Sequence, residues 1–224
     1  RGLGDVYKRQ ILWFFPLLFQ FAWAENAFSV NPLVRLETEK GNIEIELLPN
    51  QAPITVDNFI KLVNDYHYDG LIFHRVIKNF MIQTGGFTFD FTSRESNRSA
   101  ILNESANGLK NKRGTVAMAR TSDPNSAKAQ IFINHKDNDF LDSKGNKIGY
   151  AVFGKIVSGM EIVDKIAQVP TRSLGQYQNV PVEPIRIARA TLIRMGSWTP
   201  LVDSSNDSKL SLIHISEPTR RTSI

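Results

Sequence analysis

Short runs in which apolar and polar residues alternate dominate this sequence, and they restrict its fold more than any other feature. In residues 42–47, Ile43, Ile45 and Leu47 alternate with Glu44 and Glu46, which is the period of a half-buried β-strand. Many short strands with few helices favour a closed antiparallel β-barrel. The other strand-like runs are residues 33–38, 71–83 (two short strands broken at 78–79), 114–118, 130–134, 150–155 and 185–192.

The periodicity of an amphipathic helix occurs twice. Residues 53–66 place apolar side chains at i, i+3, i+4 and i+7, and Thr55 is a plausible N-cap for this helix. Residues 158–167 predict a second helix with one apolar side. The stretch from 85 to 111 is too polar for regular core structure. The apolar positions of the first helix are Val56, Phe59, Ile60 and Val63.

The two ends of the sequence are related in a way that natural termini have no reason to share. Residues 1–10 and 210–219 can be encoded by the two opposite strands of one DNA segment of ten codons. That segment resembles a transposase-type sequencing adaptor. We therefore expect residues 1–10 and 210–224 to be translated adaptor sequence, and we exclude them from reasoning about the fold.

These ends also carry much of the positive charge. The formal net charge is +5, and the two terminal stretches contribute three of those charges, which leaves +2 for residues 11–209. A strongly basic chain with clustered Lys and Arg would indicate nucleic-acid binding. The remaining sequence has no dense cluster of this kind, so we expect no nucleic-acid partner.

Residues 11–21 form an apolar segment that is too short for a comfortable membrane span, which needs about 20 residues. Ala22-Trp-Ala24 follows with the small-x-small pattern of a signal-peptidase site. We interpret residues 11–24 as a truncated signal peptide and expect a periplasmic protein that begins at Glu25. The alternative is an uncleaved anchor that faces the periplasm. The chain has no cysteine, so cysteine usage does not report its compartment.

Between these ends the length fits one domain with a sizeable core. We expect a short lead-in at residues 25–32, a single domain at residues 33–195 and a polar tail at residues 196–209. The sequence contains no internal repeat and no metal-ligand spacing. We expect a monomer without a cofactor or a metal.

The run from Phe73 to Gln83, FHRVIKNFMIQ, carries the clearest chemical signal. It combines the guanidinium of Arg75 and the amide of Gln83 with apolar side chains, and it contains no strong nucleophile. An apolar pocket with a hydrogen-bond donor at its edge suits a reaction without proton transfer or a covalent intermediate, such as rotation about an X-Pro bond. The alternative is that Arg75 is a structural ion-pair partner and its apolar neighbours are core residues.

A second block strengthens the first interpretation. The segments AMAR at 117–120, AQIFIN at 129–134 and DFLD at 139–142, together with the run at 73–83, resemble the cyclophilin family of peptidyl-prolyl isomerases over residues 33–193. The resemblance implies a mainly β fold, a closed eight-stranded antiparallel barrel capped by two α-helices. It implies an enzyme that accelerates X-Pro rotation in folding exported proteins and binds unfolded or extended proline-containing polypeptides.

The resemblance also assigns roles to individual residues. Arg75 would be the catalytic donor, aimed at the proline nitrogen of the twisted amide, and Gln83 would hold the substrate backbone. Ala119 and Gln130 would lie along the groove for the residues before proline. His74 is expected to be structural, since the reaction needs no general base. The proline pocket would be lined by Phe80, Met81, Phe132 and Leu141, with Phe140 and Tyr150 also in contact with the substrate.

Several positions depart from the best-known eukaryotic pattern and look like the bacterial branch. Arg120 stands where those cyclophilins have Asn, Tyr150 where they have His, and Thr84 where they have Gly. Phe140 stands where they have Trp, so we expect weak binding of the cyclic peptide inhibitor cyclosporin. A binding module that holds unfolded proteins without catalysis is the rival function, and the retention of Arg75 with the whole pocket argues against it.

Overall fold

The computed structural model describes residues 30–201. Its main sheet has eight strands in the order β10-β1-β2-β7-β5-β6-β4-β3, and all neighbouring strands are antiparallel. The mainly β class and the eight-stranded sheet are therefore confirmed. The strands are β1 (Leu33–Thr38), β2 (Gly41–Leu47), β3 (Arg75–Ile77), β4 (Met81–Thr84), β5 (Thr115–Met118), β6 (Ile131–Asn134), β7 (Val152–Ser158) and β10 (Ile187–Arg194).

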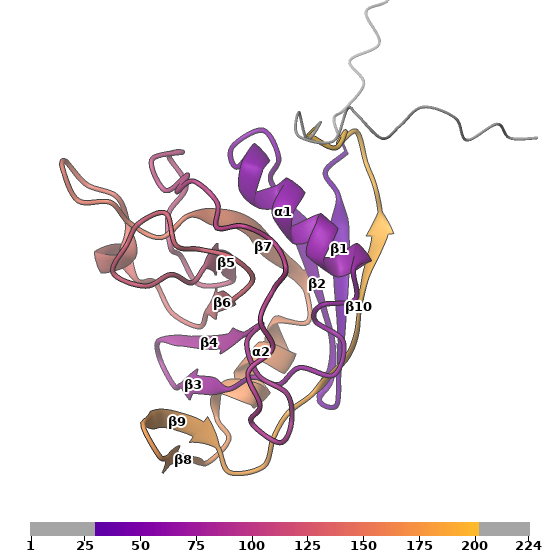
Figure 1. Ribbon diagram of the computed structural model, residues 1–224, viewed down its shortest axis with the longest axis vertical. Coiled ribbons are helices and arrows are strands. Elements are labelled where there is room, and N and C mark those ends of the chain that lie inside the picture. Colours follow the sequence, from indigo (N-terminus) through magenta and orange to yellow (C-terminus); the bar gives the residue numbers. More distant parts are fainter. Residues whose placement is uncertain (1–29, 202–224) are drawn as a thin grey trace, which may run out of the picture.

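The prediction of a closed barrel is wrong, because the sheet is an open half-barrel. Its two end strands, β3 and β10, do not form a ladder with each other in the described part of the chain. The segment just before β3 reaches β10 only through an isolated bridge between Ile72 and Arg186 and a few backbone hydrogen bonds. The strand β3 is only three residues long, and Pro184 just before the bridge cannot donate a backbone hydrogen bond. Figure 1 shows the resulting curved, open sheet.

The first helix, α1 (Pro53–Asn64), buries the apolar positions that the sequence predicts and packs against β10 and β7. The prediction that Thr55 caps this helix is wrong, since the N-cap is Ala52 and offers no side-chain hydrogen bond. Instead, the carboxylate of Glu104 accepts hydrogen bonds from the backbone N–H of Ile54 at 3.1 Å and of Thr55 at 2.8 Å. A residue from the distant polar stretch thus satisfies the free N–H groups of the helix start.

The second helix, α2 (Met160–Ala167), packs against β2, β3 and β4. Its N-cap is Gly159 in the left-handed conformation, with φ of 86°. A Cβ at this position would lie 2.1 Å from the backbone oxygen of Asn42, so both the conformation and the close approach require glycine. Gly159 therefore lets the end of β7 turn directly into α2.

The main hydrophobic core lies on one face of the sheet. Alternate strand residues point into it, together with the apolar faces of both helices. Its strand members are nearly all fully buried, and this face of the sheet therefore provides most of the apolar burial. They include Val34, Leu36, Ile43, Ile45, Val76, Ile82, Val116, Ile131 and Ile133.

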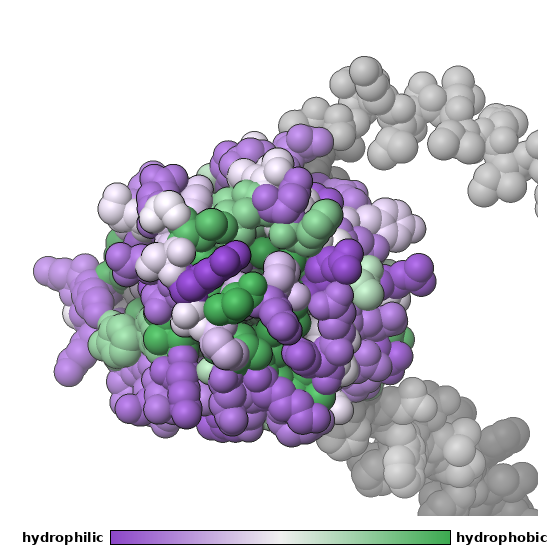
Figure 2. All heavy atoms as spheres, turned by 90° about the horizontal axis from the view of Figure 1, so that it is seen from below, coloured by the Kyte–Doolittle hydropathy of each residue, from purple (hydrophilic) through white to green (hydrophobic). Residues whose placement is uncertain are grey.

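A two-stranded ribbon, β8 (Thr171–Leu174) and β9 (Tyr177–Pro181), extends from the sheet beside β3. The sequence analysis did not predict it, because its residues are largely exposed and carry no clear alternation. Tyr177 of the ribbon packs edge-on against Phe87 and Phe91. At this end of the molecule, hydrophobic side chains gather in the centre of the face and hydrophilic ones surround them (Figure 2).

The predicted adaptor segments and signal peptide, residues 1–24 and 210–224, lie outside the described residues. The first part of the predicted polar tail, residues 196–201, packs on the domain. Trp198 contacts the main core, and the N–H of Leu201 donates to Asp57 on α1 at 3.0 Å. None of the helices within residues 30–201 has the length and the apolar character that crossing a bilayer requires.

Candidate active site

Three of the predicted site residues, Arg75, Gln83 and Phe132, lie in a row across neighbouring strands, and the row continues to Ala117, which was not predicted. Arg75 on β3 pairs with Gln83 on β4, Gln83 pairs with Phe132 on β6, and Phe132 pairs with Ala117 on β5. Directly paired residues of antiparallel strands point to the same face of a sheet. The four side chains therefore share the face opposite the main core.

Phe132 and Ala117 of this row belong to a second, smaller hydrophobic cluster that is separate from the main core. Six of the predicted substrate-contacting residues belong to it, so the structure brings together side chains that are up to 70 positions apart in the sequence. Met81, Phe132 and Leu141 are buried in the cluster, whereas Phe80, Ala119 and Tyr150 are partly exposed and offer an apolar surface for a ring such as that of proline. Of the predicted residues, the cluster contains Phe80, Met81, Ala119, Phe132, Leu141 and Tyr150.

Phe140 lies at the rim of this cluster. Its ring stacks on that of Phe80 with a centroid distance of 5.6 Å, and 61 % of its surface is exposed. It lies on a short 3-10 helix (Asp139–Leu141) that also buries Leu141 in the cluster. Phe140 therefore extends the apolar surface outward from the pocket.

Arg75 is held by an amide instead of a carboxylate. Its Nη1 donates to Oε1 of Gln83 at 3.4 Å, and Nε2 of Gln83 donates to Oε1 of Gln130 at 2.8 Å. In residues 30–201, no carboxylate lies within ion-pair distance of Arg75. The alternative of a structural ion pair therefore finds no support here, and the guanidinium keeps donors for a ligand.

A buried network of amides supports the pocket from below. Nδ2 of Asn138 donates to the backbone oxygen of Phe80 at 2.9 Å and to Oδ1 of Asn134 at 2.7 Å. Asn134 in turn donates to Asn111, whose amide donates to Asp142 at 3.0 Å. This network fixes the 3-10 helix and the backbone of Phe80, and the sequence analysis missed it. The only signal was the presence of polar residues beside apolar ones at the end of β6.

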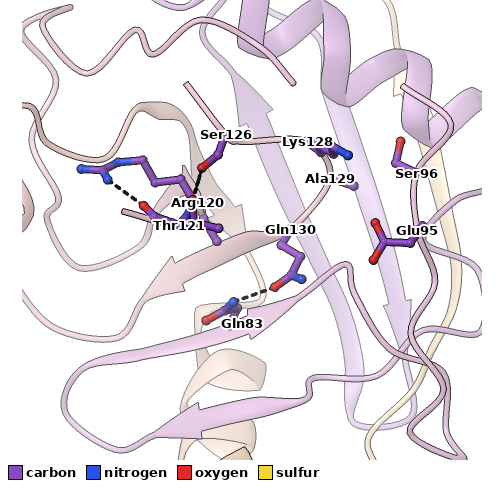
Figure 3. Close-up of a pocket in the computed structure, with 10 residues that line it drawn as sticks. Gln83, Glu95, Ser96, Arg120, Thr121, Ser126, Lys128, Ala129 and Gln130 are labelled. Atoms are coloured by element: carbon purple, nitrogen blue, oxygen red, sulfur yellow. Dashed lines mark hydrogen bonds between the residues drawn. The ribbon is translucent and has the colours of Figure 1, made fainter. Parts of the chain in front are cut away.

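A polar cavity of about 400 Å³ adjoins the row on the side of Gln83 (Figure 3). Of the predicted residues, it includes the two that were expected along the groove, and Gln83. The remaining lining residues come from two polar loops and were not predicted, because loops without periodicity give no pattern to read. The lining residues are Gln83, Glu95, Ser96, Ala119, Arg120, Thr121, Ser126, Lys128, Ala129 and Gln130.

His74, next to Arg75 in the chain, is buried beside this site, within hydrogen-bond range of the Gln130 side chain. It is 6 % exposed, its ring packs 4.9 Å from that of Phe87, and Nδ1 has no hydrogen-bond partner. Burial lowers the pKa of His74 to about 4, so the ring is neutral at pH 7. The described residues contain no group of three or more His, Cys, Asp or Glu that could hold a metal ion. The site therefore consists of an apolar cluster with a polar cavity beside it, one guanidinium and two amides.

Comparison with known proteins points to a single family. The family model for cyclophilin type peptidyl-prolyl cis-trans isomerases matches residues 33–192. A peptidyl-prolyl cis-trans isomerase of Acinetobacter baylyi is 54 % identical over 157 residues, which cover 70 % of this chain and 83 % of the relative. Peptidyl-prolyl cis-trans isomerase A of Dickeya dadantii is 52 % identical over 168 residues, which cover 75 % and 88 % of the two chains.

Solved structures agree with the sequence relatives. A cyclophilin type isomerase of Cryptosporidium parvum superimposes with a TM-score of 0.60 at 26 % identity, covering 72 % of this chain and 97 % of that one. A second structure of that protein, determined in the presence of the dipeptide Ala-Pro, gives a TM-score of 0.59 at 27 % identity, covering 71 % of this chain and 98 % of that one.

Proposed function

The chain belongs to the cyclophilin-type peptidyl-prolyl cis-trans isomerase family and is such an isomerase, and we propose that Arg75 supplies its catalytic hydrogen bond. The observation that carries this proposal is the position of Arg75. It shares one sheet face with Gln83 and Phe132, borders the apolar cluster and has no carboxylate partner among the described residues. The family binds proline-containing peptides, and the cluster offers an apolar surface for the proline ring.

The chemistry needs only binding. The X-Pro bond resists rotation with a barrier of roughly 18–20 kcal/mol, because the C–N bond has partial double-bond character. In the twisted transition state that character is lost and the lone pair returns to the proline nitrogen. A donor aimed at this nitrogen binds the twisted state better than either planar state, which lowers the barrier. Each tenfold gain in rate requires about 1.4 kcal/mol of such preferential binding.

The chain of amides orients the donor. Gln83 directs its Nε2 to Gln130, so its Oε1 remains as the acceptor for Arg75. This arrangement fixes one end of the guanidinium and leaves its other N–H groups for the substrate. Phe80, Met81, Phe132 and Leu141 receive the proline ring, and the residues before proline run past Ala119 and Gln130 toward the polar cavity.

The test is the rate of X-Pro isomerisation in a protease-coupled peptide assay. We expect Arg75→Ala to lower kcat/KM by about 100-fold or more, because a hydrogen bond made in the transition state is lost. Arg189→Ala is the matched control, since Arg189 is an exposed arginine on β10, at the opposite end of the strand order. Wild-type turnover in Arg75→Ala would show that another group stabilises the twisted amide.

We also propose that the physiological substrates are exported proteins. Support comes from the apolar segment at residues 11–21 and the small-x-small sequence Ala22-Trp-Ala24 that follows it. Expression of the chain in a Gram-negative host, followed by fractionation and N-terminal sequencing, tests this. A periplasmic product that begins at Glu25 is expected, whereas a membrane-bound product that retains residues 11–24 would favour an anchor.

A further inference from the structure

Arg120 holds two loops together beside the apolar pocket. Its guanidinium donates to three backbone oxygens within 3.3 Å, and to that of Ser122 at 3.5 Å. Two of these acceptors, Ile148 and Gly149, lie just before Tyr150, and Thr121 lies at the start of the other loop. The side chain therefore ties the segment after β5 to the segment before β7. The three shorter bonds are Nη1 to Thr121 at 2.9 Å, Nη2 to Ile148 at 3.0 Å and Nε to Gly149 at 3.3 Å.

The same guanidinium lies over an aromatic ring of the site. The central carbon of the Arg120 guanidinium is 4.5 Å from the centroid of the Tyr150 ring. Tyr150 meets the ring of Phe132 edge-on, with a centroid distance of 5.6 Å, and its N–H donates to the backbone oxygen of Leu141 at 2.9 Å. A continuous line of contacts thus runs from Arg120 through Tyr150 to Phe132, one of the residues proposed to face the proline ring.

Arg120 lines the polar cavity, but its guanidinium is largely occupied by contacts within the protein. Its Nε and both terminal nitrogens already donate to backbone oxygens, which leaves few N–H groups free. Figure 3 shows its guanidinium extending away from the Gln83–Gln130 pair. No carboxylate in the described residues lies within ion-pair distance of it. The contacts of Arg120 therefore hold two loops and the ring of Tyr150 in place.

We propose that Arg120 is a positioning residue that presses Tyr150 against Phe132 and so sets the width of the apolar pocket for the reaction. This inference rests on the proposed function of that pocket. A planar guanidinium can stack on a ring and bond to several carbonyls at once, and a lysine ammonium cannot do both. Without these contacts of Arg120, Tyr150 can move, and its packing against Phe132 becomes looser.

A double-mutant cycle on the full chain tests the proposal, with kcat and KM measured on X-Pro peptides and Tm measured for each variant. The variants are Arg120→Lys, Tyr150→Ala and the double mutant. Arg94→Lys is the matched control, because Arg94 also donates to two backbone oxygens, those of His67 and Asp69, and is not part of the apolar cluster.

Arg120→Lys should lower kcat/KM by about tenfold, mainly through a higher KM, because the binding surface is loosened while Arg75 is unchanged. In the Tyr150→Ala background, Arg120→Lys should lower kcat/KM by less than about twofold, because the ring that Arg120 positions is already absent. Arg94→Lys should stay within about twofold of wild type.

Equal losses from Arg120→Lys in both backgrounds would overturn the inference, and so would wild-type activity in Arg120→Lys. If Arg120→Lys loses its thermal transition, Arg120→Gln takes its place in the cycle under the same criteria. A wild-type protein that fails to accelerate isomerisation would refute the proposed function itself. An inactive wild type can be told apart from failure of the Arg120 proposal, because wild-type activity is measured before any variant is compared with it.

Discussion

The two faces of the strands β3, β4, β6 and β5 use neighbouring residues for different purposes. On one face, Val76, Ile82, Ile133 and Val116 form a row of paired residues in the main core, each at most 2 % exposed. On the other, one position away in each strand, lie Arg75, Gln83, Phe132 and Ala117. The first row is uniform and apolar, whereas the second mixes a charge and an amide with apolar groups.

The difference shows how a short strand can serve stability and catalysis together. Because side chains alternate between the faces, the inner row fixes the backbone position of each outer residue to within the tolerance of the packed core. In the outer row, Arg75 and Gln83 can then stay half-buried and still be well ordered, whereas Phe132 and Ala117 are at most 4 % exposed. Substitutions in the inner row should therefore mainly lower the free energy of unfolding, and substitutions in the outer row should mainly lower kcat/KM.

The largest effect is expected from a pair of substitutions on β4. Ile82→Ala removes a fully buried side chain and should lower the free energy of unfolding by about 2–5 kcal/mol, while the protein that remains folded stays active. Gln83→Ala, at the next residue of β4, should lower the free energy of unfolding by about 1 kcal/mol or less, because Gln83 is half-buried and water can replace its contacts.

Gln83→Ala should nevertheless lower kcat/KM by about tenfold, because Arg75 loses the acceptor that orients it. Denaturant unfolding and the peptide assay on both variants measure the two quantities. The comparison between the faces would fail if Ile82→Ala lost more activity per folded molecule than Gln83→Ala.

A smaller effect is expected from the buried histidine next to Arg75. Burial lowers the pKa of His74 to about 4 in the folded protein, below its ordinary value near 6.5. The unfolded chain therefore binds a proton that the folded protein resists, so stability falls as the pH drops from about 6.5 toward 4. Between pH 7.5 and pH 5, His74 should therefore lower the free energy of unfolding by roughly 2 kcal/mol.

His74→Phe keeps a ring beside Phe87 and removes the titration. Unfolding curves at pH 7.5 and pH 5 should show a smaller loss of stability in this variant than in the wild type. Its isomerase activity at pH 7.5 should stay within about threefold of the wild type, since the reaction needs no general base. An equal loss in both proteins would mean that folding does not lower the pKa of His74.

The smallest effect concerns the rim of the outer face. Phe140 is exposed and stacked on Phe80, but it has no hydrogen-bond donor. Phe140→Trp adds an indole N–H and more surface, and should tighten cyclosporin binding by about 1 kcal/mol or somewhat more, which is roughly tenfold. Turnover of short peptides should change little, because they depend on the pocket and not on its rim.

Cyclosporin titration in the peptide assay measures this change, and Phe140→Leu is the control for a side chain without a donor. If the wild-type protein is already inhibited tightly, other residues of the groove determine the affinity and the role assigned to Phe140 is wrong.

Much of the fold was predictable from the sequence, since alternation and helical periodicity mark elements that bury one face. The strand at residues 42–47 and the helix that begins at Pro53 are examples. Closure of the barrel was not predictable, because it depends on whether the distant ends β3 and β10 meet. The N-terminal cap of α1 was missed for a similar reason, since Glu104 is 49 positions away from Thr55.

The candidate site likewise contains residues that the sequence predicted and residues that it did not. The resemblance assigned Arg75, Gln83 and the apolar residues together, and the structure places them on one face. The supporting contacts of Asn138 and Arg120 were not predicted, because their partners are backbone oxygens of other segments. A backbone oxygen is present at every position, so the sequence gives no indication of which one a side chain will contact.

The catalytic role of Arg75 is tested most directly by the isomerisation rate of a bound proline peptide, measured by NMR exchange spectroscopy for the wild type and Arg75→Lys. Lysine keeps the charge of Arg75 but lacks its planar set of donors. We predict that the peptide binds both proteins with affinities within about threefold, while cis–trans exchange on the bound peptide slows by about tenfold or more in Arg75→Lys. Exchange at the wild-type rate would contradict the claim that the guanidinium of Arg75 stabilises the twisted amide.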